Sequence, residues 1–94
     1  MAAIGVLTLD IYVESSHSLK EKRHVVKSLK DRLRHKFNVS VAEIGHLDSW
    51  QASVVVAVTV SNDRLRAEQV LQAVEAHAES LLGGALTGTG VEWV

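Results

Sequence analysis

Basic side chains are concentrated in one segment of the sequence. The chain has ten lysine and arginine residues, and eight of them lie between positions 20 and 36. With two acidic residues, this segment has a formal charge of +6, whereas the rest of the chain, with two basic and nine acidic residues, has −7. Such a concentration of positive charge could neutralise the phosphates of a nucleic acid or meet an acidic protein surface.

The spacing of these residues fits one side of a helix. Five of them recur at intervals of three and four residues and would form a row about 20 Å long, at about 1.5 Å per residue. A merely soluble helix usually interleaves Glu with Lys, and only Glu21 and Asp31 oppose the row here. We therefore predict phosphate contacts in this segment, although a purely solvated face remains an alternative. The predicted nucleic-acid-binding residues are Lys20, Lys22, Arg23, Lys27, Lys30 and Arg34.

The elements that position this segment can be predicted from periodicity. Residues 3–14 alternate like a strand, and Ser18 followed by Glu21 is the capping signal of a helix from Leu19 to Lys36, which Asn38 could end in a left-handed conformation. Two further strands are predicted over 39–44 and 50–60. In the strand over 50–60, we expect the even-numbered valines to face the core. A second helix is predicted over 64–82 and an edge strand over 85–94, which Gly88 and Gly90 weaken.

This order of elements, β-α-β-β-α-β, predicts the fold class. We expect a single α+β domain over residues 1–94, with a ferredoxin-like, four-stranded antiparallel sheet and two helices on one face. The other face would stay open. It is rather apolar, which favours a homodimer or a protein partner. The predicted interface residues on this face are Ile4, Val6, Tyr12 and Val55.

Other chemistry finds little support in the sequence. There is no cysteine, and the five histidines show neither the spacing nor the partners of a metal site, so we predict no metal, cofactor or catalytic residue. No small-molecule substrate can be identified. The central strands lack the aromatic residues that RRM domains stack on bases. We expect Trp50 to pack at the rim of the core. The apolar runs are too short for a membrane span, which favours a cytoplasmic location.

Several motifs resemble those of the YlxP-like bacterial family, a family without a defined activity. The similarity begins with residues 18–23 of the basic segment and continues through residues 27–34, residues 37–43, Trp50-Gln51 and residues 60–63. It implies a ferredoxin-like fold, and family members are often encoded beside translation-initiation and ribosome-maturation factors. The expected function is therefore a non-catalytic protein that binds RNA or the ribosome; the alternative is a protein-interaction module that uses the open sheet face.

Overall fold

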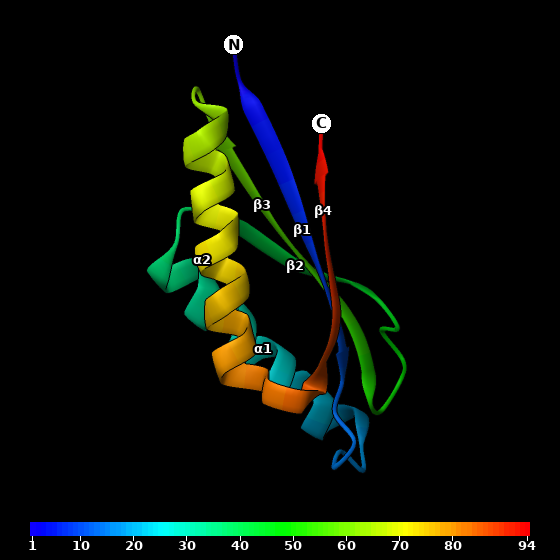
Figure 1. Cartoon of the computed structure of the whole chain (residues 1–94). Helices are drawn as coiled ribbons and strands as arrows, with labels where there is room; N and C mark the ends of the chain where they lie inside the picture. The colour runs from blue at the N-terminus through cyan, green and yellow to red at the C-terminus, as the bar shows by residue number, and fades with distance from the viewer.

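The computed structural model describes all residues from 1 to 94, as one sheet with two long helices (Figure 1). Both helices have the bounds predicted from the sequence, because their first turns carry local capping signals. In chain order the elements are β1 (Ala3–Tyr12), α1 (Leu19–Lys36), β2 (Ser40–Gly45), β3 (Ala52–Ser61), α2 (Arg64–Leu82), the short 3-10 helix η1 (Gly83–Ala85) and β4 (Leu86–Trp93).

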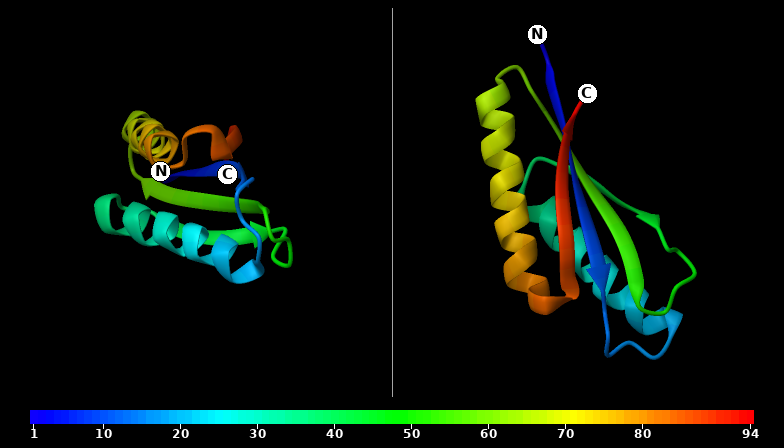
Figure 2. Two further views of the ribbon diagram at one scale, coloured as in Figure 1. Left: turned by 90° about the horizontal axis from the view of Figure 1, so that it is seen from below. Right: turned by 45° about the vertical axis from the view of Figure 1, so that its right-hand side comes forward.

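The four strands form one sheet in the order β2-β3-β1-β4, and every neighbouring pair is antiparallel. This is the predicted ferredoxin-like arrangement, with β2 and β4 as the edge strands. In the end-on view of Figure 2, α2 is seen nearly along its axis while α1 lies lengthwise, so the two helices cross at a wide angle. The molecule is elongated, with principal extents of 45 × 21 × 21 Å.

The predicted start of α1 is confirmed in atomic detail. The Ser18 hydroxyl accepts a hydrogen bond of 3.1 Å from the backbone N–H of Glu21, whose carboxylate in turn accepts the N–H of His17 at 2.7 Å. The helix ends at Lys36 as predicted, but the predicted left-handed conformation of Asn38 is wrong. The chain leaves the helix at Phe37 in an extended conformation, and Asn38 has no positive φ. The N–H of Phe37 instead bonds to the carbonyl of Leu33.

The core lies between the helices and one face of the sheet. The odd-numbered residues of β1 from Gly5 to Ile11 are buried, as the alternation predicted, and Leu7 and Leu9 are 0% exposed. They pack with Leu33 of α1 and Leu71 of α2 in one cluster of 13 buried residues. Because both helices contribute to that cluster, their buried stripes face the same side of the sheet, and the other side is left without a covering layer.

The predicted orientation of β3 is wrong. Val55 and Ala57 are 0% exposed, and the even-numbered valines lie on the open face. The register places them there, because Val58 is paired with Val6 of β1. Two polar residues of β3, Ser53 and Thr59, are tolerated on the core face because each has a hydrogen-bond partner. The Ser53 hydroxyl donates to Glu43 Oε2 at 2.6 Å, and the Thr59 hydroxyl donates to a backbone carbonyl at 3.0 Å.

This register corrects one predicted interface residue. Val55 is a core residue and cannot contact a partner. The other three predicted interface residues, Ile4, Val6 and Tyr12, do lie on the open face, and Tyr12 is 48% exposed. The remaining apolar residues of the two central strands on that face are Ala52, Val54, Val56, Val58 and Val60.

Candidate nucleic-acid interface on helix α1

The predicted row of basic residues lies along one flank of α1. The buried stripe of the helix, which includes Val26, Leu29 and Leu33, fixes its rotation on the sheet. With this rotation, four residues of the row are exposed and Lys30 is partly buried. The charge of Lys30 is close enough to Glu43 of β2 to help lower the pKa of that carboxyl, so the row faces the β2 side. We call the residues Lys20, Arg23, Lys27, Lys30 and Arg34 the basic row.

Asp31 neutralises part of the basic row. Its carboxylate accepts from Lys27 Nζ at 2.7 Å and from Arg34 Nη2 at 2.9 Å. The two hydrogen bonds hold the pKa of Asp31 below its usual value. The sequence predicts a helix that lacks ion pairs between neighbouring turns. At Asp31 this prediction is wrong, because the carboxylate pairs with both Lys27 and Arg34. Lys20, Arg23 and Lys30 form no ion pair, so two of the three unpaired residues of the basic row lie in the first half of the helix. Arg32 and Lys36, which lie outside the row in the second half, are also unpaired.

Lys22 does not belong to this surface, contrary to prediction. Its side chain is 0% exposed, and its Nζ lies 2.9 Å from Glu43 Oε2 and 3.0 Å from the carbonyl oxygen of His46. A buried lysine with these partners cannot reach a phosphate. The sequence contained the signal, because Lys22 precedes Val26 by four residues and Leu29 by seven, the spacing of the buried stripe.

Glu43 is the centre of this buried polar network. Burial alone would raise the pKa of its carboxyl, but hydrogen bonds from the Ser53 hydroxyl and Lys22 Nζ, together with nearby positive charge, lower it overall. Glu43 is therefore ionised and bridges β2, β3 and α1. Through His46, the same network also fixes the loop between β2 and β3 beside the first turns of α1.

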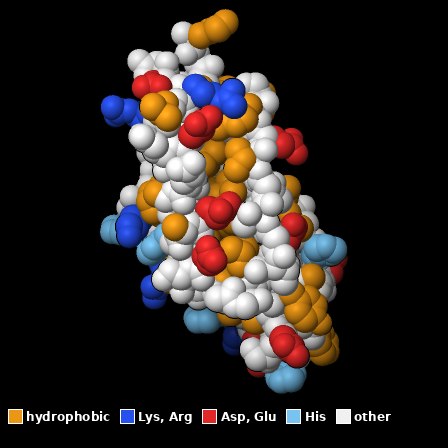
Figure 3. Space-filling view, viewed as in Figure 1, with side chains coloured by type: hydrophobic (Ala, Val, Ile, Leu, Met, Phe, Trp, Pro, Cys, Tyr) orange, Lys and Arg blue, Asp and Glu red, His pale blue; other side chains and the backbone are white.

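That loop and the end of β2 carry three exposed apolar residues. Ile44 is 60% exposed, Leu47 51% and Trp50 55%, so Trp50 does not pack at the rim of the core as predicted. In Figure 3, hydrophobic side chains gather over the lower right of the molecule, the end that carries the β2–β3 loop in Figure 1. We call Ile44, Leu47 and Trp50 the apolar tip.

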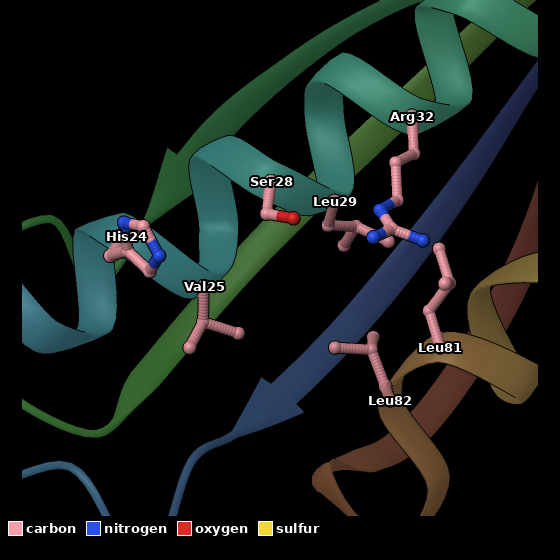
Figure 4. Close-up of a pocket in the computed structure, with 7 residues that line it drawn as sticks. All are labelled: His24, Val25, Ser28, Leu29, Arg32, Leu81 and Leu82. Atoms are coloured by element: carbon pink, nitrogen blue, oxygen red, sulfur yellow. The ribbon is translucent and has the colours of Figure 1, made fainter.

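A shallow groove runs along the opposite flank of α1, between this helix and the end of α2. Figure 4 shows the Arg32 guanidinium extending from α1 toward Leu81 of α2, with Val25 and Leu82 also lining the groove. Its volume is about 250 Å³. The two carboxylates with shifted pKa values, Asp31 and Glu43, are not among its lining residues. Arg32 therefore places positive charge on a second side of α1.

Comparison with known proteins identifies the family. Residues 4–89 match the family described as protein of unknown function DUF503. The chain belongs to this family. It is also 39% identical over 90 residues to the uncharacterized protein YlxP of Bacillus subtilis strain 168, covering 96% of this chain and 98% of that protein. Family membership confirms the resemblance stated above and assigns no activity.

Solved structures with low sequence identity share the fold. The designed protein Foldit4 superimposes with a TM-score of 0.60 at 13% identity, covering 100% of this chain and 97% of the design. A putative antibiotic biosynthesis monooxygenase from Bordetella bronchiseptica gives 0.57 at 14% identity, with 100% and 96% covered. A dimeric ferredoxin-like protein of unknown function from Thermobifida fusca gives 0.55 at 15% identity, with 99% and 90% covered. These likenesses show the architecture alone. Neither helix is long and apolar enough to cross a bilayer.

Proposed function

We propose that this protein is a non-catalytic RNA-binding protein of the cytoplasm that holds structured RNA or a ribosomal particle through the basic row of α1. The observation that supports the proposal is the exposed, unpaired positive charge in the first half of that helix. Lys20 and Arg23 are exposed and form no ion pair, and Lys27 follows one turn later. Spaced along a rigid helix, such residues match a phosphate backbone rather than a single anion.

Phosphate contacts of this kind give binding with a characteristic salt dependence. Each phosphate that a lysine or arginine neutralises releases a counterion, so the affinity falls as the salt concentration rises. Backbone contacts position the RNA and carry little sequence information. We therefore expect weak sequence preference. RNA is favoured over other polyanions because genes of the resembled family often lie beside those of translation factors.

The test compares two exposed arginines on different helices. Arg23→Glu removes a member of the basic row, whereas Arg66→Glu makes the same charge change on α2, away from the row. Binding of a structured RNA hairpin is measured across a salt series. We expect Arg23→Glu to weaken binding and flatten the salt dependence by about 0.7–0.9 in slope per lost contact, and Arg66→Glu to change both much less.

A triple variant extends the comparison along the row. Lys20→Glu, Arg23→Glu and Lys27→Glu together should abolish most of the binding without unfolding the protein, because all three side chains are exposed. Circular dichroism checks the fold. If wild type and triple variant bind the hairpin equally well, or if the wild type binds no RNA at low salt, the proposal is wrong.

The open sheet face favours a second function, association of two copies of this chain. The apolar side chains of β1 and β3 there are interrupted only by Thr8 and Asp10. The four strands contain 34 residues, so at about 3.3 Å per residue and about 4.8 Å between strands this face offers roughly 540 Å² per partner. A pair of such faces would bury roughly 1,100 Å², which is the size of a weak or transient interface.

Sizing at several protein concentrations tests this second function. Val58→Lys places a charge at the centre of the open face and should leave a monomer. Leu65→Lys is the control, because Leu65 is an exposed apolar residue on α2, outside the open face. A wild type that stays monomeric at high concentration, or a Val58→Lys variant that associates as the wild type does, would contradict association through this face.

A further inference from the structure

Hydrogen bonds attach the β2–β3 loop, which carries Leu47 and Trp50, to the start of α1. Lys22 Nζ donates to the carbonyl of His46 on one side of the loop, and Gln51 Nε2 donates to the carbonyl of Ser16 at 3.1 Å on the other. Within the loop, the Ser49 hydroxyl accepts the N–H of Ala52 at 2.9 Å. The loop is therefore tied both to α1 and to the segment that precedes it, and the position of Trp50 relative to α1 is fixed.

Exposure of a large aromatic side chain on such a loop calls for a partner. Trp50 leaves more than half of its surface in water, where burial of a large aromatic ring would be favourable. Its loop is attached to the N-terminal half of α1, the half in which Lys20 and Arg23 are unpaired. The hydrogen bond from Lys22 to His46 attaches the loop of Trp50 to the same turn of α1 that carries Lys20 and Arg23. An aromatic ring and cations on two such connected elements can bind an unpaired nucleotide, with the base on the ring and the phosphate on a cation.

We propose that Trp50 stacks on an unpaired base of the RNA whose backbone the basic row binds. This inference rests on the proposed RNA-binding function and makes it more specific. The ligand would contain a single-stranded element, such as an overhang, a bulge or a loop, at the end of the molecule where β2 and β3 connect. Leu47 would line the edge of the base, since it is exposed in the same loop.

The positive charge of α1 favours a nucleotide over a purely apolar protein surface as the partner of the apolar tip. The turn of α1 to which the loop is attached also carries Lys20 and Arg23, which a nucleotide phosphate can contact and a neutral apolar partner cannot. Asp48 is the one acidic residue within the loop. It opposes an anionic ligand locally, so Asp48→Asn should strengthen binding of the single-stranded element.

The experiment uses tryptophan fluorescence with two RNA probes. The only other tryptophan, Trp93, pairs with Gly5 at the far end of β1, with the Arg64 guanidinium 4.0 Å above its ring. Trp93→Phe therefore leaves Trp50 as a single reporter. The probes are a blunt RNA duplex and the same duplex with a short single-stranded uridine overhang. If Trp93→Phe does not fold, the difference between wild type and Trp50→Phe supplies the same signal.

We expect the overhang probe to quench Trp50 and to bind at least about tenfold more tightly than the blunt duplex, in the range of one stacked base. Trp50→Ala should remove this advantage and leave binding of the blunt duplex unchanged. Trp50→Phe should retain part of the advantage. Leu65→Ala, which removes an equally exposed apolar side chain from α2, should not alter it.

The other outcomes separate this inference from the proposed function. If the duplex binds through the basic row but the overhang adds neither affinity nor quenching, the stacking role of Trp50 is wrong and RNA binding stands. If neither probe binds, both proposals are wrong. If Trp50 fluorescence changes with protein concentration in the absence of RNA, the apolar tip is a contact between protein molecules, which also overturns the inference.

Discussion

Lys22 Nζ and Glu43 Oε2 are 2.9 Å apart, and the lysine side chain is 0% exposed. This ion pair joins α1 to β2 inside the domain, and the hydroxyl of Ser53 satisfies the same carboxylate oxygen. A buried pair of this kind adds little to stability compared with a well-packed apolar pair, but losing one partner leaves the other charge buried and uncompensated. The two residues should therefore be strongly coupled.

Removing either partner should have unequal effects. Glu43→Ala leaves the ammonium of Lys22 with only the carbonyl of His46 and should lower the free energy of unfolding by about 3 kcal/mol. Lys22→Met keeps an apolar side chain of similar length, leaves a carboxylate that Ser53 still satisfies, and should cost about 1 kcal/mol. Urea unfolding of both variants and of the double variant measures the coupling. Additive effects would show that the pair does not act as a unit.

The same pair should make stability depend on pH. Because the pKa of Glu43 in the folded protein is below its usual value of 4.5, its contribution to stability is complete above pH 4.5. It is lost as the pH falls through the lower, folded value. Glu43→Gln lacks this titration. We therefore expect the unfolding free energies of wild type and Glu43→Gln to converge on acidification below pH 4.5, and parallel curves would contradict the role assigned to Glu43.

Asp31 should restrain RNA binding. Asp31→Asn releases Lys27 and Arg34 from its carboxylate, so the proposed function predicts tighter binding of the RNA hairpin and a steeper salt dependence. Stability should change little, since the charges of such an exposed pair are screened by water. Glu68→Gln, which releases Arg64 on α2, is the matched control and should not affect binding. Unchanged affinity in Asp31→Asn would place the RNA away from this part of α1.

Adjacent valines of β3 should respond differently to the same substitution. Val55→Thr introduces a hydroxyl into a fully buried site and should cost about 1–3 kcal/mol. Val56→Thr introduces it on the open face and should leave the stability of the monomer nearly unchanged, because the hydroxyl can reach water there. Urea unfolding at low protein concentration compares the two. Equal losses would contradict the register of β3.

Local signals carried the prediction of the fold. Ser18 and Asp63 cap helices whose apolar stripes follow directly, and β1 alternates so regularly that its buried face could be assigned. In β3 the alternation did not identify the buried face, because both faces carry apolar residues. The even-numbered valines lie on one face, and Val55 and Ala57 lie on the other. Hydrophobicity therefore does not distinguish its two sides.

The candidate site was predictable in its charge but not in its contacts. The basic row follows from the spacing of residues on one helix. Lys22 lies at a position of the buried stripe but was assigned to the surface because it is charged, and its partner Glu43 is 21 residues away in the sequence. The exposure of Trp50 depends on how the loop is tied to α1, which only the assembled fold decides.

The two polar side chains on the buried face of β3 have a consequence for how the chain finds its native pairing. A strand apolar on both faces can shift by one residue relative to its neighbours and still bury valines, so misaligned sheets would compete during folding. Only the native alignment gives the hydroxyl of Ser53 the Glu43 carboxylate and that of Thr59 a carbonyl acceptor. In a shifted sheet, the two hydroxyls would either be buried without a partner or be exposed while valines take their places in the core. The two hydrogen bonds therefore favour the native alignment over alignments that bury a similar apolar surface.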